Sequence, residues 1–144
     1  MKVVINNDYG GFGLSAKAKK RYLELNGQQA YFYKQVTRFA TYVEKYERID
    51  NVEDANGIFV ICTTKDHGKL LSDFPDDVFH SSALSRYDPI LVQVVEELGK
   101  SASGCYANLK VVDIENGRYF KIDEYDGYES IQYRDIDDEW MLAQ

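Results

Sequence analysis

The sequence predicts an α+β fold in which two amphipathic helices pack on a mostly antiparallel sheet that ends in a C-terminal meander. Two segments have apolar residues at helical spacing and capping residues at their ends. Several runs of β-branched and aromatic residues lie between turn residues, and Asn-Gly and Asp-Gly pairs near the C-terminus indicate hairpins. The chain of 144 residues has the length of one ordinary domain. We therefore expect residues 1–144 to form a single domain.

The N-terminal part of the chain contains a predicted strand and the first predicted helix. Lys2–Asn6 (KVVIN) is rich in β-branched residues, which favour a strand. Asn7–Leu14 is a glycine-rich connection. Ser15 is suited to cap a helix that runs to about Asn26, with Gly27 as its stop. Apolar residues recur along one side of this helix, so we expect that side to face the core.

The middle of the chain is rich in strand-forming residues. Ala30–Gln35 is aromatic and strand-like. Thr41–Ile49 fits either a strand or a helix, and its aromatic and β-branched content favours the strand. Gly57–Thr64 is the clearest strand, and its nearly continuous apolar run predicts a central position with both faces covered. Lys65–Arg86 has no regular period, so we expect a long loop with one short strand.

The C-terminal part combines the strongest helix signal with three predicted strands. Asp88–Leu98 has an N-cap aspartate, a proline at the first helical position and a glycine directly after it. Leu109–Ile114 and Tyr119–Tyr125 flank the sequence ENGR, which predicts a hairpin. An Asp-Gly pair then leads into Tyr128–Arg134 as a third strand. These strands together form the predicted meander.

The formal charge of −7 is concentrated in the C-terminal quarter. Residues 1–112 carry 14 acidic and 14 basic side chains, whereas residues 113–144 carry 10 acidic and 3 basic ones. A chain with this balance is not expected to bind nucleic acid directly. It also contains no run of about 18 apolar residues, so we expect no membrane span. The acidic quarter is either a solvated surface or a site for a basic partner, such as the nucleic-acid groove of an enzyme.

Tyrosines alternate with acidic residues in this same quarter and define a candidate partner-binding surface. Tyrosine supplies a large apolar ring and a hydroxyl group, and it is enriched at protein interfaces. The alternative is that alternate tyrosines point inward and pack in the core. Self-association through this surface or through a sheet edge is a further candidate. The candidate residues are Tyr119, Asp123, Tyr125, Asp126, Tyr128, Tyr133 and Asp137.

The glycine-rich connection is a second candidate site, for a small anionic ligand such as a nucleotide-type signal. Backbone N–H groups between a strand and a helix N-terminus can hold an anion, and nearby basic residues would add positive charge. The glycine spacing matches neither nucleotide-binding fingerprint, and a tight turn alone would also explain it. For Arg86, a structural role that ties the long loop to the start of the second helix is favoured over ligand binding. The candidate residues are Tyr9, Gly10, Gly11, Phe12, Gly13, Lys17, Lys20, Arg21 and Arg86.

Catalysis and metal binding have little support in the sequence. Cys105 could in principle form a nucleophile pair with His67 or His80, but nothing in the sequence fixes their geometry. Adjacent carboxylates point to opposite faces of an extended strand, so they do not converge on one metal ion. Neither an EF-hand nor an HExxH motif is present. We therefore expect no catalytic residue, no metal and no cofactor.

Three motifs resemble a widespread family of small bacteriophage and prophage proteins. They are VINNDYGGFGLS near the start, RYDPILVQVVEELGKSASGCYANLKVVDI in the second half and YFKIDEYDGYE near the end, and together they cover about half of the chain. Glu139-Trp140 is similar to a charged residue and tryptophan that often follow the last motif. The resemblance implies a phage accessory protein that acts in the host bacterial cytoplasm. The family has no established activity to carry over to this chain. By analogy, small acidic phage proteins of this size often inhibit host enzymes or defence proteins, so we expect a non-enzymatic inhibitor of a host protein.

Overall fold

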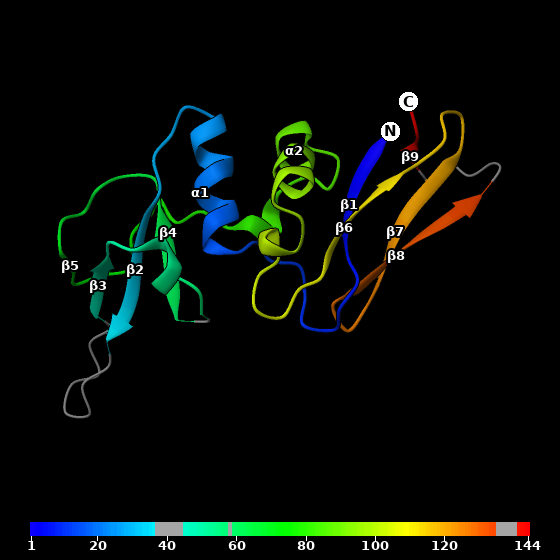
Figure 1. Cartoon of the computed structure of the whole chain (residues 1–144). Coiled ribbons are helices and arrows are strands. Elements are labelled where there is room, and N and C mark those ends of the chain that lie inside the picture. The colour runs from blue at the N-terminus through cyan, green and yellow to red at the C-terminus, as the bar shows by residue number, and fades with distance from the viewer. Residues whose placement is uncertain (37–44, 58, 135–140) are drawn as a thin grey trace.

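The computed structural model describes residues 1–36, 45–57, 59–134 and 141–144. These residues form two α-helices and nine β-strands, and every pairing between the strands is antiparallel, which confirms the predicted α+β class. Figure 1 shows the elements in layers: a four-stranded sheet, the two helices, a two-stranded sheet and a three-stranded sheet. Among the described helices, none is long and apolar enough to cross a membrane.

β1 and α1 form where the sequence predicts them. β1 spans Lys2–Asn6, and α1 spans Ala16–Leu25. The helix begins after Ser15, whose Oγ accepts a hydrogen bond from the Ala18 N–H at 3.2 Å, and it is capped at its other end by Asn26. The glycine that follows has a positive φ of 75°, which is typical of the residue that ends a helix.

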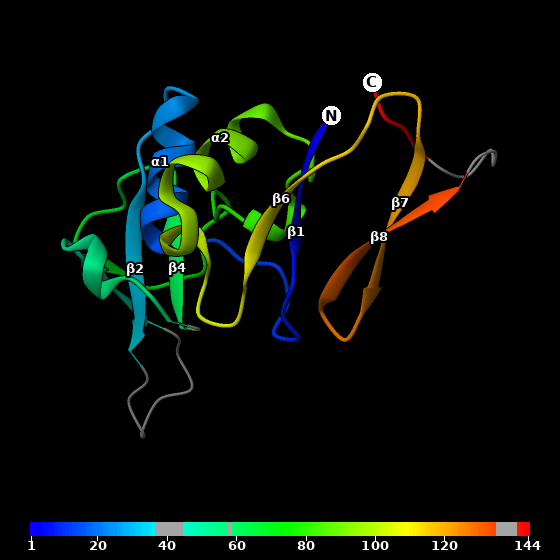
Figure 2. The same cartoon turned by 45° about the vertical axis from the view of Figure 1, so that its right-hand side comes forward.

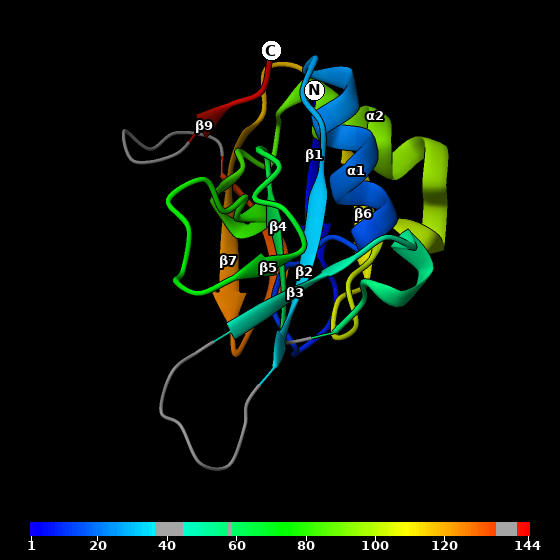
Figure 3. The same cartoon turned by 90° about the vertical axis from the view of Figure 1, so that its left-hand side faces the viewer.

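The four-stranded sheet has the order β4-β2-β3-β5, and Figure 3 views the molecule from the side of this sheet. Its strands are Tyr31–Val36 (β2), Lys45–Ile49 (β3), Val60–Thr63 (β4) and Leu70–Leu71 (β5). One face packs on α1, where Phe32 and Cys62 share a core with Leu23. The predicted strand Thr41–Ile49 is confirmed as β3, and its first residues, 41–44, lie outside the described part of the chain.

The strand predicted within Gly57–Thr64 is present as β4, but its predicted central position is wrong, because β4 lies at the edge of this sheet and β2 lies inside it. The open side of β4 is nevertheless covered by another segment of the chain. Thr63 pairs with Val78 in an isolated bridge, and the Phe79 N–H donates to the Cys62 carbonyl at 2.8 Å. An apolar run therefore indicates that a strand is covered, and a loop segment can cover it as well as a neighbouring strand.

The predicted long connection Lys65–Arg86 is confirmed, and it contains one short strand, β5, and a 3₁₀ turn at Ser81–Ala83. The connection covers the sheet face opposite α1. Tyr33 points from β2 to this side and is fully buried, and its hydroxyl donates to the Gly68 carbonyl at 2.9 Å. The loop is thus held on the sheet by a buried tyrosine as well as by backbone pairing.

α2 spans Pro89–Leu98 and confirms the strongest helix prediction. Its N-cap is Asp88, whose Oδ1 accepts a hydrogen bond from the Ile90 N–H at 2.9 Å. The helix packs beside α1, and the Tyr22 hydroxyl of α1 donates to Asp88 at 2.5 Å. Burial and this hydrogen bond raise the pKa of Tyr22 to about 12. The hydroxyl therefore stays protonated at neutral pH and continues to link the two helices.

The predicted hairpin at Glu115–Arg118 is wrong, although the chain does turn there. β6 (Leu109–Asp113) pairs with β1, whereas β7 (Tyr119–Tyr125) belongs to the three-stranded sheet. β1 is buried on both faces: Val4 lies in the core beside the helices, and Val3 lies in a second core that includes residues of β7. β6 extends this buried layer, so β7 stacks over the layer instead of pairing with β6.

The second predicted hairpin is confirmed. β7 pairs with β8 (Tyr128–Arg134) across a two-residue turn in which φ is 49° at Asp126 and 85° at Gly127. β9 (Met141–Leu142) pairs with the other edge of β7. The C-terminal antiparallel sheet is therefore present, and its third strand is β9 in place of β6.

Candidate functional site

Three connections from distant parts of the chain meet at one end of the molecule, as Figures 1 and 2 show. They are the glycine-rich connection after β1, the loop before β6 and the turn between β7 and β8. A Cβ on Gly10 would lie 2.1 Å from the Cβ of Tyr106, and a Cβ on Gly127 would lie 2.6 Å from the backbone nitrogen of Gly11. Glycine is therefore required at both points, because the backbones approach more closely than a side chain permits.

Asn6 joins the three connections through one buried amide group. It is the last residue of β1 and is fully buried. Its Nδ2 donates to the carbonyls of Asp8 and Gly127, each at 2.9 Å, and its Oδ1 accepts a hydrogen bond from the Asn108 N–H at 2.9 Å. Hydrogen bonds inside a protein hold their groups firmly when every polar atom has a partner. This amide therefore fixes the relative positions of the three connections.

Arg86 and Glu129 form a second link beneath the same end of the molecule. Glu129 is 7% exposed, and its Oε1 accepts a hydrogen bond from the Asn6 N–H at 2.9 Å. The Nε of Arg86 lies 3.3 Å from both oxygens of Glu129, and its Nη1 donates to the Leu84 carbonyl at 3.0 Å. The guanidinium also stacks on Phe12 at 3.6 Å. Arg86 thus ties the long loop, the glycine-rich connection and the C-terminal hairpin together.

The side chains exposed where the three connections meet are mainly tyrosines. Tyr9 is 61% exposed, and its ring contacts that of Tyr128 with centroids 5.2 Å apart. Tyr125 is 79% exposed and lies opposite Tyr128 in the hairpin. Tyr106 is as exposed as Tyr9. We call the following set the loop-end surface: Tyr9, Tyr106, Tyr125, Tyr128 and the flanking carboxylates of Asp8 and Asp126.

Part of the predicted partner-binding set lies on this surface. Tyr119, Asp123 and Tyr125 alternate along β7 and therefore share one face. Tyr128 is on the same face because it lies opposite Tyr125, and Asp126 occupies the turn between them. The hairpin thus brings the last three together with Tyr9, whereas Tyr119 lies at the far end of the strand.

The other predicted partner-binding residues are arranged differently. Tyr133 faces the opposite side of the hairpin, where the guanidinium of Arg118 stacks over its ring at 4.3 Å. Asp123 lies 3.8 Å from the Nζ of Lys121, so its charge is partly neutralised. Asp137 lies outside the described residues, as does the Glu-Trp pair that follows it. Alternation along the strands therefore divides the tyrosines between two faces.

At the predicted anion site, two N–H groups of the first turn of α1 are bonded to other side chains of the protein. The Ala16 N–H donates to Asn56 Oδ1 at 3.0 Å. The Ala18 N–H donates to Ser15 Oγ, which in turn donates to the Ser101 carbonyl at 2.6 Å. These capping bonds satisfy donors that a bound anion would otherwise use.

The basic residues predicted to line that site form ion pairs elsewhere on the helices. Arg21 Nε lies 3.0 Å from Glu97 of α2, and this hydrogen bond lowers the pKa of Glu97. Lys20 lies 3.8 Å from Glu24 one turn later, and Lys17 is exposed. Lys20 and Arg21 thus pair with carboxylates of the two helices, whereas Arg86 and Phe12 of the predicted set meet each other.

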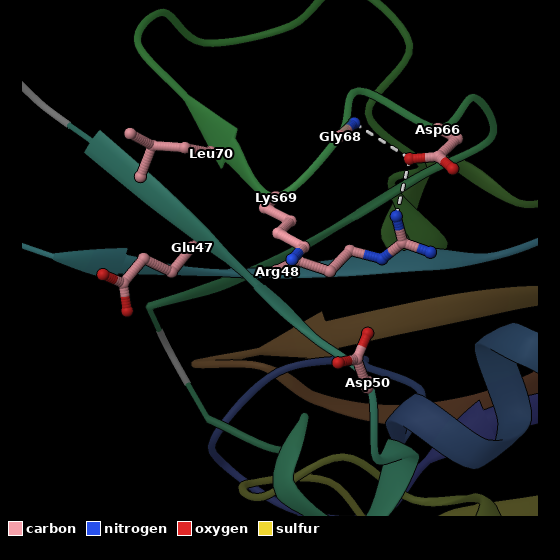
Figure 4. A pocket seen from close by; sticks show the side chains of 7 residues that line it. All are labelled: Glu47, Arg48, Asp50, Asp66, Gly68, Lys69 and Leu70. Carbon is pink, nitrogen blue, oxygen red and sulfur yellow. Dashed lines mark hydrogen bonds and ion pairs between the residues drawn. The ribbon is translucent and has the colours of Figure 1, made fainter.

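A charged cavity of about 690 Å³ lies on the four-stranded sheet, away from the loop-end surface (Figure 4). Arg48 points toward Asp66 at 2.6 Å and stacks on Tyr31 at 4.6 Å. The Gly68 N–H also donates to Asp66, and this bond together with Arg48 lowers the pKa of Asp66. The arginine and the aspartate satisfy each other, which indicates a role in holding the long loop. The lining residues are Glu47, Arg48, Asp50, Asp66, Gly68, Lys69 and Leu70.

A histidine–aspartate pair fastens the same loop. His67 Nε2 lies 2.7 Å from Asp77 Oδ1, and Asp77 Oδ2 accepts a hydrogen bond from the Lys65 N–H at 2.8 Å. Burial acts to raise the pKa of Asp77, but the hydrogen bonds from His67 and Lys65 outweigh it, so that the pKa is lowered. The backbone N–H of His67 also donates to the Tyr33 hydroxyl at 3.0 Å. The pair therefore connects the start of the loop to its middle and, through Tyr33, to the sheet.

Cys105 is exposed beside the loop-end surface and lines a cavity of about 350 Å³ with Phe59 and Tyr106. Neither histidine lines this cavity, and His67 is bonded to Asp77. The described residues thus do not place a histidine next to this thiol. Within the same described ranges, no group of three or more His, Cys, Asp or Glu side chains is placed to hold a metal ion.

Sequence reasoning did not identify Asn6, Asp8, Tyr106 or Glu129 as parts of this end of the molecule. A signal existed for Asn6, because an asparagine at the end of a β-branched run is a polar residue in a buried strand and needs partners. Glu129 looked like one more acid of the acidic quarter, and Tyr106 like one residue of a small polar loop. The role of Glu129 depends on its contact with Asn6, which lies more than one hundred residues away in the sequence.

Comparison with known proteins gives no family assignment. No family model, no curated protein and no solved structure matches the chain. A functional proposal for this chain therefore rests on the geometry of the described residues and on the similarity of its sequence motifs.

Proposed function

We propose that this chain is a non-enzymatic phage accessory protein that binds and inhibits a host protein, and that it binds through the loop-end surface. The similarity of three sequence motifs to small phage proteins supports the phage origin. The observation that carries the binding role is the convergence of exposed tyrosines from three separate connections. The host component is a protein in the bacterial cytoplasm, and a protein of anti-phage defence is one such target.

The exposure of these tyrosines supports an interface. Large aromatic rings that lie together on a surface mark sites of protein association more often than chance surface residues do. Tyr9, Tyr125 and Tyr106 each expose more than half of their surface. Tyrosine rings also lose few rotatable bonds on binding, so an interface built from them orders at low entropic cost.

The base beneath the tyrosines supports the same role. Asn6 and the Arg86–Glu129 pair hold the three connections by hydrogen bonds that are buried or partly buried. A surface whose backbone is fixed before binding pays less for ordering its loops when a partner arrives. A loop surface that lacked such links would lose affinity to the ordering of its own backbone.

The test is capture of a host protein from a lysate of the bacterial host. Tagged wild-type protein is expected to retain one host protein in stoichiometric amount. The double variant Tyr9→Ala/Tyr125→Ala should not retain this host protein. It removes one highly exposed ring from the glycine-rich connection and one from the β7–β8 hairpin. Phe74→Ala is the matched control, since Phe74 is 53% exposed in the loop over the four-stranded sheet.

Inhibition of the host pathway should parallel capture: the wild type and Phe74→Ala should inhibit it, and Tyr9→Ala/Tyr125→Ala should not. If the double variant folds like the wild type and still captures and inhibits the target at full strength, the loop-end surface is not the binding site. If a stoichiometric host protein is lost with Phe74→Ala instead, the binding site lies on the other side of the molecule.

A further inference from the structure

We propose that the loop-end surface recognises arginine side chains of its partner, an inference that rests on the proposed protein-binding function. An arginine guanidinium is planar, stacks on aromatic rings and can donate to two carboxylate oxygens at once. The surface offers both kinds of contact within two adjoining connections. Tyr9 contacts Tyr128, and Tyr128 lies opposite Tyr125, so the three rings form a row. Asp8 directly precedes Tyr9 and Asp126 directly follows Tyr125 in the sequence, and the Asn6 amide bonds the carbonyls of Asp8 and Gly127.

The aromatic half of the recognition has parallels inside this chain. Three arginines stack on rings: Arg86 on Phe12 at 3.6 Å, Arg118 on Tyr133 at 4.3 Å and Arg48 on Tyr31 at 4.6 Å. The exposed rings of the row differ in one respect. No cation of the described part of the chain lies over Tyr9, Tyr125 or Tyr128. Tyr128 is half-buried against Tyr9, so the exposed surfaces of Tyr9 and Tyr125 are the parts of the row most accessible to a cation from another molecule.

The carboxylates provide the charge that a guanidinium requires. Asp8 Oδ1 accepts a hydrogen bond from the Tyr9 N–H at 2.7 Å, which orients the side chain and leaves Oδ2 available. Asp126 is exposed in the hairpin turn. Neither carboxylate has a cationic partner among the described residues, in contrast to Asp123, which pairs with Lys121. The surface is thus negative where it is aromatic.

Arginine fits this surface better than lysine for physical reasons. The guanidinium is weakly hydrated, so it loses less solvation when it lies on a ring, and its flat shape contacts a ring and a carboxylate in one geometry. An ammonium group is a compact and strongly hydrated charge that uses the carboxylate alone. A partner surface with exposed arginines, such as a nucleic-acid-binding groove, is therefore the kind of surface that this row of rings would cover.

The experiment measures binding of two synthetic peptides, one with alternating Arg and Gly and one with alternating Lys and Gly, by calorimetry and by shifts of the tyrosine ring signals in NMR spectra. The Arg peptide should bind several-fold more tightly and should shift the signals of Tyr9 and Tyr125. The double variant Asp8→Asn/Asp126→Asn should bind it about tenfold more weakly, a change worth about 1.4 kcal/mol. Asn keeps the acceptor for the Tyr9 N–H and suits a positive φ, so the fold should be retained.

The matched control is Asp73→Asn/Asp76→Asn, which removes two exposed carboxylates from the loop over the four-stranded sheet and should leave binding of the Arg peptide unchanged. Equal affinity for the two peptides, or unchanged affinity in Asp8→Asn/Asp126→Asn, would overturn the inference. Capture of a host protein that is insensitive to these aspartates would overturn it while leaving the proposed function intact. Selective binding of the Arg peptide without any captured host protein would support the inference and count against the proposed function.

Discussion

The Arg86–Glu129 pair should contribute more to stability than any other ion pair described in this chain, because its side chains are only 18% and 10% exposed. Replacing Glu129 with Leu leaves the guanidinium without a carboxylate and the Asn6 N–H without an acceptor. Breaking a buried pair by removing one partner costs about 3–5 kcal/mol, and the unsatisfied N–H overlaps with this cost. We therefore expect Glu129→Leu to lower the free energy of unfolding by about 4 kcal/mol, a large part of the about 5–15 kcal/mol typical of a domain.

Urea denaturation followed by circular dichroism measures this loss, and the melting temperature should fall by about 10–15 °C for a chain of this size. The double variant Arg86→Met/Glu129→Leu should recover about half of the loss, because it removes the unpaired charge, although the Asn6 N–H and the Leu84 carbonyl both lose their side-chain partners. Arg21→Met provides the control, since its pair with Glu97 is exposed and should contribute less than about 1 kcal/mol. A loss below about 1 kcal/mol for Glu129→Leu would refute the reasoning, because it would place this pair among ordinary surface pairs.

Three further predictions concern the glycine contacts, the long loop and the thiols. Gly10→Ala should destabilise the chain by about 2 kcal/mol or more in urea denaturation, because its Cβ would collide with Tyr106, whereas Gly13→Ala has open space. The pKa of Asp77 is lowered in the folded chain, so its bonds contribute stability above about pH 4 that is lost as the pH falls further, and Asp77→Asn should flatten the acid-unfolding curve there. Cys62 is buried and its pKa is raised to about 11, so a disulfide reagent should titrate Cys105 alone in the native state and both thiols in urea.

Local signals in the sequence predicted the local parts of this fold. Ser15 and Asp88 cap the helices as expected, because capping depends on residues a few positions apart. The Asp-Gly turn between β7 and β8 also forms, since its two residues alone set the positive φ angles that the hairpin needs. Each of these features depends only on residues that are a few positions apart in the sequence.

Pairing between strands could not be predicted in the same way. Glu115–Arg118 does reverse the chain, but the reversal does not decide which strand becomes a neighbour. β1 is apolar on both faces and needs a layer on each side, so β6 joins β1 and β7 stacks over them. β4 is an edge strand whose apolar run is explained by the segment around Val78. Coverage of a strand is a property of the whole fold, and an apolar run does not say what provides it.

The same distinction applies to the candidate site. The sequence suggested two separate sites, a glycine-rich anion site and an acidic, tyrosine-rich surface in the C-terminal quarter. The glycine-rich connection contributes Tyr9 and Asp8 to the loop-end surface, and Gly10 allows its backbone to approach Tyr106 closely. Arg86, predicted to bind a ligand, holds the surface from beneath. Two patterns far apart in the sequence thus describe one place in the structure.

The negative charge of the C-terminal quarter is less available in the structure than the count of acidic residues suggests. Of the acids between residues 113 and 134, Glu129 is buried in an ion pair and Asp123 pairs with Lys121. Asp126 remains exposed at the loop-end surface, where Asp8 from the balanced part of the chain joins it. The net charge of the quarter is therefore a poor guide to the site, because burial and pairing remove charges that a count includes. What distinguishes this end of the molecule is that two carboxylates, Asp8 and Asp126, have no cationic partner among the described residues and belong to the same connections as exposed aromatic rings; this combination is the basis of the proposed arginine recognition.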